Sequence, residues 1–209
     1  MANRRDFIVL ATAACASGAR AARRSPVILV VGDSMSAEYG LPRGSGWVAL
    51  LRERLAREKI GAEVVNASVS GDTTPGGRSR LPQLLEAHRP TLVVIELGGN
   101  DALRGLPLKN TQENLAWMAR QARAAGARVL LVGMQVPPNY GADYTRRFAA
   151  IFETIAAEEK TALVPFLLTG IADRPDAADF FQADRIHPNA RAQPMMLDNV
   201  WKALAPLLR

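Results

Sequence analysis

A single stretch near the N-terminus, VILVVGDSMSAEYG (Val27–Gly40), indicates both the fold and a candidate nucleophile. Its apolar run predicts a buried strand that ends at Val31, and the following Gly32, Asp33 and Ser34 predict a turn. In open α/β sheets the ligand crevice lies at the carboxyl ends of the strands, which is where this turn places Ser34. Gly, Asp and Ser also favour turns and helix N-caps, so the stretch alone fits a purely structural serine equally well.

Strand-like and helix-like patterns alternate along the rest of the chain. Apolar runs predict strands at 27–31, 63–66, 91–97, 128–133 and 162–166. Amphipathic spacing predicts helices at 47–59, 78–88, 110–125, 143–160 and 190–208. Five strands that alternate with helices favour an α/β fold with a parallel sheet and helices on both of its faces.

A serine hydroxyl is a weak nucleophile and needs a base within hydrogen-bond reach, most often histidine. Of the two histidines in the chain, His88 ends an amphipathic helical pattern, where interaction with the helix C-terminus explains it. His187 lies in a polar loop three residues after Asp184, so a single turn can bring that carboxylate to the imidazole. The same pattern also fits an ordinary Asx turn with a surface histidine. Residues 170–184 are irregular, and Phe180 and Phe181 are interpreted as a partly apolar wall near His187.

Two further strand-like runs end near residues that can donate hydrogen bonds. Asn100 follows LVVIELGG (92–99), and Gly71 follows VVNASVS (64–70), where a missing side chain lets a backbone N–H approach a ligand closely. The N–H groups of Ser34 and Gly71 and the amide of Asn100 would together make a three-donor oxyanion hole. A turn glycine and a loop-capping asparagine are the structural alternatives when each is taken alone. All four segments in chain order favour the functional interpretation.

These four segments resemble the four sequence blocks of the SGNH hydrolases, also called the GDSL family, with Ser34, Gly71, Asn100 and His187 in the family's order. Asp184 matches the aspartate that precedes the family histidine by three residues. The resemblance runs from about residue 26 to the C-terminus. The segments NASVSGDT (66–73), ELGGND (96–101) and PPNYG (137–141) are most similar to a bacterial periplasmic branch of acyl-CoA thioesterases, lysophospholipases and arylesterases.

The resemblance implies a three-layer α/β/α sandwich around a flavodoxin-like five-stranded parallel sheet of order 2-1-3-4-5, in one domain spanning 26–209. It implies a serine esterase or thioesterase that acts on small-molecule acyl esters or thioesters without a metal or other cofactor. Ser34 would form the acyl-enzyme, His187 would be its base, and Asp184 would orient His187. Ser34, Gly71 and Asn100 would form the oxyanion hole.

Two residues depart from that branch of the family. Glu38 stands where glycine commonly follows Ser-x-Ser-Ala, and Arg185 stands where glycine commonly separates the aspartate from Ile-His-Pro. Neither change removes a predicted catalytic group. Both lie near the predicted site, which makes them candidates for changing the range of accepted substrates.

The sequence lacks the motifs of several other classes of enzyme. It contains no G-x-S-x-G, H-E-x-x-H or Walker A motif, and two histidines with one cysteine cannot build a usual zinc site. The glycine-rich stretch 71–77 lacks the phosphate-loop lysine and is interpreted as a mobile active-site loop. A carbohydrate O-deacetylase of the same family and a non-catalytic lipid- or glycan-binding module remain as alternatives to the esterase.

The N-terminus has the features of a secretory signal peptide over residues 1–22. A basic start at 1–5 precedes an apolar segment, 7–16, that is too short for an ordinary membrane-spanning helix, and an A-x-A-like cleavage site at 19–21. Arg4-Arg5 also resembles the twin-arginine export motif, whereas Cys15 fits a lipoprotein box poorly because Thr12 replaces an aliphatic residue. We therefore expect a periplasmic or secreted protein with no stable membrane span after processing.

Charge and cysteine content narrow the range of partners. The formal net charge of +6 comes mostly from arginines scattered along the 209 residues, without the interleaved aromatic residues typical of nucleic-acid binding. A processed chain would contain no cysteine and would therefore need no disulfide in an oxidising compartment. We expect a small-molecule substrate and no nucleic-acid partner. A monomer is favoured, and the sequence leaves the oligomeric state open.

Overall fold

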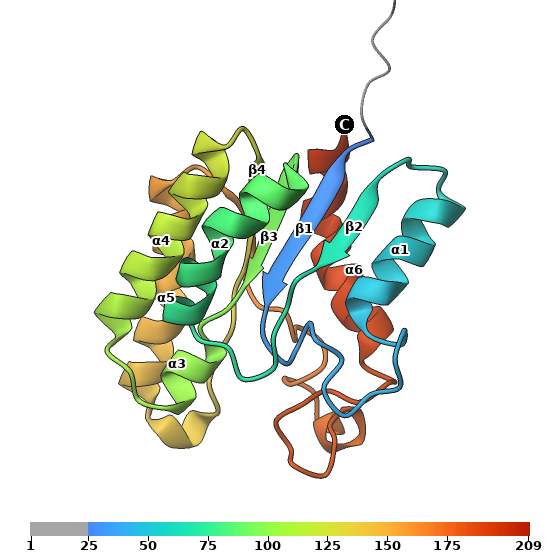
Figure 1. The fold of residues 1–209 in the computed structure, drawn as a ribbon. Helices are drawn as coiled ribbons and strands as arrows, with labels where there is room; N and C mark the ends of the chain where they lie inside the picture. The colour runs from blue at the N-terminus through green and yellow to red at the C-terminus, as the bar shows by residue number, and fades with distance from the viewer. Residues whose placement is uncertain (1–24) are drawn as a thin grey trace, which may run out of the picture.

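A computed structural model describes residues 25–209, and its centre is one parallel five-stranded sheet (Figure 1). The strands are β1 (Val27–Gly32), β2 (Glu63–Asn66), β3 (Leu92–Glu96), β4 (Arg128–Val132) and β5 (Ala162–Val164). Their order across the sheet is β2-β1-β3-β4-β5. The predicted α/β class and strand order are therefore confirmed. The predicted signal peptide, residues 1–22, lies outside the described residues.

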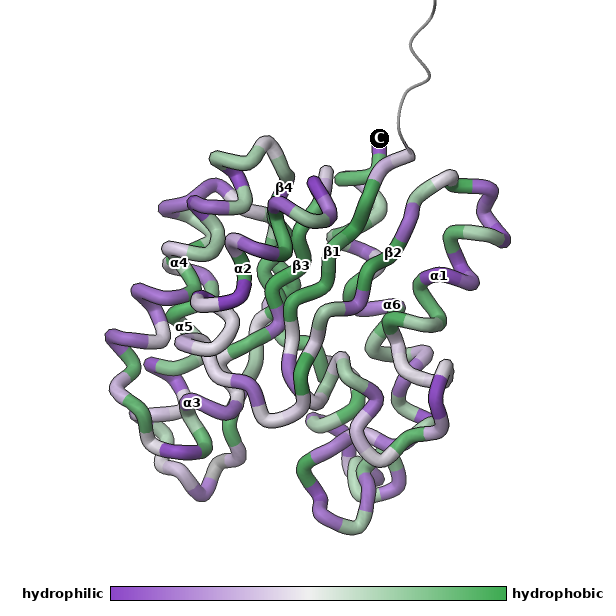
Figure 2. The backbone as a smooth tube through the Cα atoms, viewed as in Figure 1, coloured by the Kyte–Doolittle hydropathy of each residue, from purple (hydrophilic) through white to green (hydrophobic). Residues whose placement is uncertain are grey.

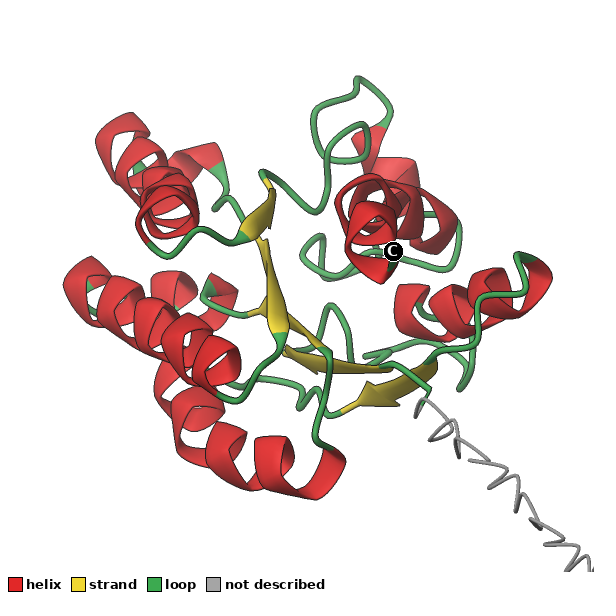
Figure 3. Ribbon diagram, turned by 90° about the horizontal axis from the view of Figure 1, so that it is seen from above, coloured by secondary structure: helices red, strands yellow, loops and turns green. Residues whose placement is uncertain are grey.

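Helices cover both faces of the sheet and complete the three layers, which Figure 3 shows from above. On one face lie α1 (Trp47–Arg57) and α6 (Gln193–Leu204), which pack against each other. On the other face lie α2 (Thr74–His88), α4 (Leu108–Ala124) and α5 (Ala142–Glu158), and the short α3 (Gly99–Leu103) precedes α4. Short 3-10 turns occur at Pro138–Tyr140, Ala177–Phe180 and Ala205–Leu208. Among residues 25–209, no helix combines the length and the apolar character needed to cross a bilayer.

The central strands are buried because helices cover them on both sides. Every residue of β3 is buried, and in β1 only Val27 is partly exposed. Such near-continuous apolar runs are typical of parallel sheets with both faces covered. Figure 2 shows the hydrophobic strands at the centre of the molecule and alternating hydrophilic and hydrophobic positions along the helices. The helices add large buried side chains to this core, among them Trp47, Phe148 and Phe152.

The order of the strands creates a crevice at the carboxyl ends of β1 and β3. The chain leaves β1 toward β2 on one side and returns to β3 on the other, which is the topological switch point where α/β sheets bind ligands. Gly32 pairs in register with Glu96 at these two ends. The connections after the strands gather at the lower end of the molecule in Figure 1, together with the segment that precedes α6. Ser34 and Asn100 follow the two strand ends, so the fold brings both to one edge.

Two local predictions at this edge were wrong. Helix α2 begins at Thr74 rather than at 78, so the second half of the stretch 71–77 is helical and not a loop. The Asp101 carboxylate accepts hydrogen bonds from the backbone N–H and the hydroxyl of Thr74, and this carboxylate stabilises the N-terminus of α2 from 27 residues away. Asn100, expected on a loop, lies in the short α3. A cap supplied by a distant side chain has no local sequence pattern, which is why the start of α2 was missed.

Candidate active site

Ser34 lies in the turn directly after β1, and its side chain is partly exposed. The turn is organised by Asp33, whose carbonyl accepts the N–H of Ser36 at 3.2 Å and whose carboxylate accepts the N–H of Met35 at 3.0 Å. These bonds reverse the chain within a few residues of the strand end. The hydroxyl of Ser34 is thereby presented at the carboxyl edge of the sheet, as the sequence predicted.

His187 is brought to Ser34 across 153 residues of sequence. It lies in a tight reversal closed by an antiparallel bridge between Phe181 and Pro188. Its Nε2 atom is 2.9 Å from the Ser34 hydroxyl oxygen. The ring of Tyr39 packs against the imidazole, with 4.4 Å between the ring centroids. The imidazole is therefore held on one side by an aromatic ring and directed at the serine.

Asp184 stands on the other side of the imidazole. One carboxylate oxygen, Oδ2, lies 2.6 Å from Nδ1 of His187, and the other, Oδ1, accepts the backbone N–H groups of Ile186 and His187 at 3.0 Å each. Partial burial raises the pKa of Asp184, but the hydrogen bonds from His187 and from the two backbone N–H groups outweigh it and lower the pKa to about 2. Asp184 is therefore a carboxylate at neutral pH. Ser34, His187 and Asp184 thus form one continuous chain of contacts.

Two backbone N–H groups at this edge have no acceptor. Within residues 25–209, the N–H groups of Ser34 and Gly71 donate to no protein atom. Gly71 has a φ of +79°, which glycine adopts without strain, and its carbonyl accepts a hydrogen bond from Arg104 at 3.0 Å. Its loop is attached to the end of β1 because the N–H of Val69 donates to the carbonyl of Gly32 at 3.0 Å. Both groups are therefore available to an oxygen of a bound molecule.

The amide of Asn100 points toward the turn that carries Ser34. Its Nδ2 donates one hydrogen bond to Oδ2 of Asp33 at 3.0 Å, which fixes the orientation of the amide because a carboxylate can only accept. The second N–H of Nδ2 remains for another acceptor. Asn100, Ser34 and His187 all line the same cavity, whereas Gly71 does not line it.

Two buried carboxyl groups behind Ser34 were not predicted. Asp33 and Glu96 are 3% and 0% exposed, and Oε2 of Glu96 accepts hydrogen bonds from the Ser36 hydroxyl at 2.7 Å and from the Asp33 N–H at 3.4 Å. Burial raises the pKa of Asp33 to about 6, against the lowering effect of hydrogen bonds from Met35 and Asn100. Burial and the neighbouring Asp33 charge raise the pKa of Glu96 well above its ordinary value. The one sequence signal for this pair is a charged residue at the end of the apolar run LVVIE.

A cavity of about 1000 Å³ opens beside Ser34. Most of its lining is apolar and comes from α3, α5 and the connections after β4 and β5, including Leu103, Met134, Val136, Ala149, Phe166 and Leu168. The predicted wall before His187 is present in part. Phe181 lines the cavity, whereas Phe180 is 8% exposed and packs into the core. The cavity can therefore accept an apolar group that extends away from the serine.

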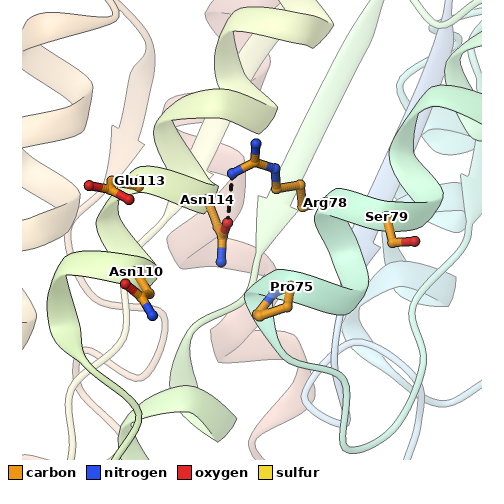
Figure 4. A pocket seen from close by; sticks show the side chains of 6 residues that line it. All are labelled: Pro75, Arg78, Ser79, Asn110, Glu113 and Asn114. Carbon is orange, nitrogen blue, oxygen red and sulfur yellow. Dashed lines mark hydrogen bonds between the residues drawn. The ribbon is translucent and has the colours of Figure 1, made fainter.

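A second, smaller pocket of about 370 Å³ lies between α2 and α4 (Figure 4). Arg78 donates a hydrogen bond to Asn114 at 3.0 Å, and Asn114 in turn donates to the hydroxyl of Thr74 at 3.1 Å. This network continues to Asp101, next to Asn100. None of the predicted site residues lines the pocket. Its polar side chains join α2 and α4 and support the position of α3.

Known proteins share the sequence pattern and the fold of this chain. The sequence model of the GDSL-like Lipase/Acylhydrolase family matches residues 30–193. Esterase TesA of Pseudomonas aeruginosa is 56% identical over 181 residues, which cover 87% of this chain and 89% of that protein. Thioesterase 1/protease 1/lysophospholipase L1 of Escherichia coli K12 is 39% identical over 202 residues, which cover 97% and 91%. A crystal structure of TesA matches with a TM-score of 0.83 at 56% identity and covers 87% of this chain and 99% of that one. The chain therefore belongs to the GDSL-like lipase/acylhydrolase family of hydrolases.

Proposed function

We propose that this protein is a serine esterase and thioesterase that hydrolyses acyl esters and thioesters through an acyl-enzyme on Ser34. The observation that carries the proposal is the line of contacts from Ser34 to His187 at 2.9 Å and on to Asp184 at 2.6 Å, at the mouth of an apolar cavity. Membership of a hydrolase family whose relatives are named esterase, arylesterase and thioesterase supports the same reaction class.

In the proposed mechanism, the Ser34 hydroxyl attacks the acyl carbon while Nε2 of His187 takes its proton. Asp184 holds the imidazole in the productive tautomer and stabilises the imidazolium that forms. The N–H groups of Ser34 and Gly71 and the free N–H of Asn100 stabilise the oxyanion. His187 then protonates the leaving group, and water, activated by the same imidazole, releases the acid from Ser34. This sequence requires no group beyond the side chains and N–H groups of the site.

The size of the cavity supports acyl chains of medium to long length. Each buried methylene contributes about 0.8 kcal/mol, which corresponds to roughly a fourfold gain in kcat/KM per added carbon while the cavity still has room. An acetyl group would leave most of the 1000 Å³ cavity unfilled. For this reason we favour the esterase function over that of a carbohydrate O-deacetylase.

The decisive experiment compares the unaltered protein with Ser34→Ala on p-nitrophenyl esters from acetate to decanoate. We expect kcat/KM to rise with chain length, and Ser34→Ala to lower it at least about 10⁴-fold because triad members act as a unit. Ser79→Ala on α2 is the matched control and should leave the rate unchanged. A fluorophosphonate should label the unaltered protein and not Ser34→Ala.

Other outcomes of this series support the competing functions. A marked preference for acetate would favour the deacetylase. No turnover of any ester would favour the binding module. Normal turnover by Ser34→Ala would contradict the proposed nucleophile.

We also propose that residues 1–22 are a signal peptide and that the enzyme acts in the periplasm or outside the cell. The basic start, the short apolar segment and the A-x-A-like site support this proposal. Mass spectrometry of the exported protein should find a new N-terminus between about residues 20 and 25. An exported species that begins at Met1 would contradict cleavage, and a lipid-modified Cys15 would establish a lipoprotein instead.

A further inference from the structure

Among residues 25–209, five non-glycine residues have a backbone in the left-handed region. Their φ values are +60° at Glu38, +56° at Lys59, +44° at Arg89, +50° at Lys160 and +57° at Arg185. This conformation is unfavourable for any residue that carries a Cβ atom. Three of the five, Lys59, Arg89 and Lys160, stand at the C-terminal ends of α1, α2 and α5. Left-handed caps are common there, and a positive charge interacts favourably with the helix end.

Glu38 is accounted for by bonds within its own loop. Its carboxylate accepts the N–H of Gly44 at 3.0 Å and the N–H of Gly46 at 2.9 Å. Gly46 is the N-cap residue of α1, so the Glu38 side chain closes the loop that leads into this helix. A glycine at position 38 would relieve the backbone but would lose these bonds.

Arg185 has no comparable compensation. Its backbone conformation belongs to the turn in which Asp184 accepts the N–H groups of Ile186 and His187, a turn that glycine would fit without strain. Within residues 25–209, the guanidinium of Arg185 makes neither an ion pair nor a hydrogen bond with the protein. Its side chain lines the large cavity together with Ser34 and His187. A strained position with an unpaired charge beside a reactive site points to a ligand contact.

Among the described residues that line the cavity, Arg185 is the positively charged side chain that has no partner. Arg146 also lines the cavity, but it is paired with Asp143. Asp33 and Asp173 are the carboxyl groups of the lining, and Asp33 accepts hydrogen bonds from Met35 and Asn100. The charge of Asp184 is directed at His187. A guanidinium presents paired N–H donors that match the oxygens of a phosphate group.

We propose that Arg185 binds a phosphate group on the leaving group of the acyl substrate. The inference rests on the proposed function, in which the acyl chain fills the apolar cavity. His187 must reach the leaving atom to protonate it, and Arg185 lies two residues away on the same exposed turn. The polar part of the substrate therefore leaves the cavity past Arg185. Both a coenzyme A thioester and a lysophospholipid carry a phosphate in the leaving group. It lies close to the scissile bond in the lysophospholipid and beyond the pantetheine arm in the coenzyme A thioester.

The test uses two thioesters that share the acyl chain and the scissile bond, octanoyl-coenzyme A and octanoyl-pantetheine, of which only the first carries phosphate. Arg185→Gln should lower kcat/KM for octanoyl-coenzyme A about three- to tenfold, mainly through KM, and leave octanoyl-pantetheine unchanged. Arg185→Lys should retain part of the preference. Raising the salt concentration should weaken the preference for octanoyl-coenzyme A over octanoyl-pantetheine in the unaltered protein but not in Arg185→Gln. Arg57→Gln, an exposed arginine in the last turn of α1, is the matched charge control.

A second pair of substrates identifies the source of the phosphate. If the natural leaving group is a glycerophosphate, Arg185→Gln should slow a lysophosphatidylglycerol more than a monoacylglycerol of the same chain, and by a larger factor than it slows octanoyl-coenzyme A. A larger factor for octanoyl-coenzyme A identifies the thioester.

The proposal is overturned if Arg185→Gln slows both members of a pair equally, which indicates a structural role, or changes neither. If the unaltered protein hydrolyses none of the four substrates, the proposed function itself fails, and the proposal of a phosphate site fails with it.

Discussion

Two aspartates near the candidate site lie in opposite surroundings. Asp33 is buried behind Ser34, whereas Asp184 stands on the exposed turn before His187. Asp33 is 3% exposed, and burial raises its pKa to about 6. The side chain of Asp184 is 36% exposed, and hydrogen bonds lower its pKa to about 2 although its partial burial acts in the other direction. The two residues lie on either side of the same serine and histidine.

The difference shows where a permanently charged carboxylate can be maintained. Asp184 keeps its charge because donors from its own turn and from His187 surround it while water still reaches it. Asp33 receives donors too, from Met35 and Asn100, but it has lost its water and lies beside a second buried carboxyl, Glu96. The first arrangement suits a group that must stabilise an imidazolium. The second suits a group that positions neighbouring atoms.

The largest effect is expected from Asp184→Asn, which changes the exposed aspartate of this pair. Asparagine can still accept the backbone N–H groups of Ile186 and His187 and so preserve the turn, but its amide favours the wrong imidazole tautomer. We expect kcat to fall about 10³- to 10⁴-fold with KM changed only a few-fold, measured on p-nitrophenyl octanoate. A loss of less than tenfold would show that Asp184 does not orient the base.

An intermediate effect is expected from Asn100→Ala, which removes the residue that joins Asp33 to the oxyanion hole. Because its free N–H should bind more strongly as charge develops on the oxygen, we expect kcat to fall about 100-fold or more with a small change in KM.

Asp101→Asn is the matched control on the same short helix. The Asp101 side chain is buried and accepts hydrogen bonds from Thr74, so the substitution should lower the melting temperature and leave kcat within a few-fold. A rise in KM alone for Asn100→Ala, or a larger loss of kcat for Asp101→Asn, would remove Asn100 from the oxyanion hole.

The smallest effect is expected from Asp33→Asn and concerns stability rather than rate. A carboxyl whose pKa is raised in the folded state binds its proton more tightly when folded. It therefore stabilises the fold at low pH and loses this contribution as the pH rises from about 4 to about 6. Asp33→Asn removes this titration and one cause of the raised pKa of Glu96, which acts in the same direction.

The free energy of unfolding, measured in urea from pH 4 to pH 7, should therefore fall with pH more steeply in the unaltered protein. The difference between the two proteins should change by on the order of 2 kcal/mol over this range. Parallel pH profiles would contradict the raised pKa of Asp33.

Much of the fold and of the site was predictable because the relevant signals are local. The apolar run 27–31 and the motif around Ser34 lie within one short segment, and Asp184 and His187 are three residues apart. A strand of parallel sheet must be apolar on both faces, and a triad aspartate on the same turn as its histidine needs only that turn. The start of α2 at Thr74 was missed because its cap, Asp101, belongs to another segment.

The sequence by itself determined the order of strands and helices along the chain and the residue types of the site. The left-handed backbone at Glu38 and Arg185 was visible only in the structure. Only the tertiary structure decided which residues meet. The parallel register places Gly32 opposite Glu96 and so creates the buried pair of Asp33 and Glu96, 63 residues apart. The packing of α3 and α5 against the connections after β4 and β5 creates the cavity beside Ser34. The periodicity of a segment indicates which of its faces is buried. Contacts between residues far apart in the sequence depend on strand register and on the packing of the layers, which no short sequence pattern encodes.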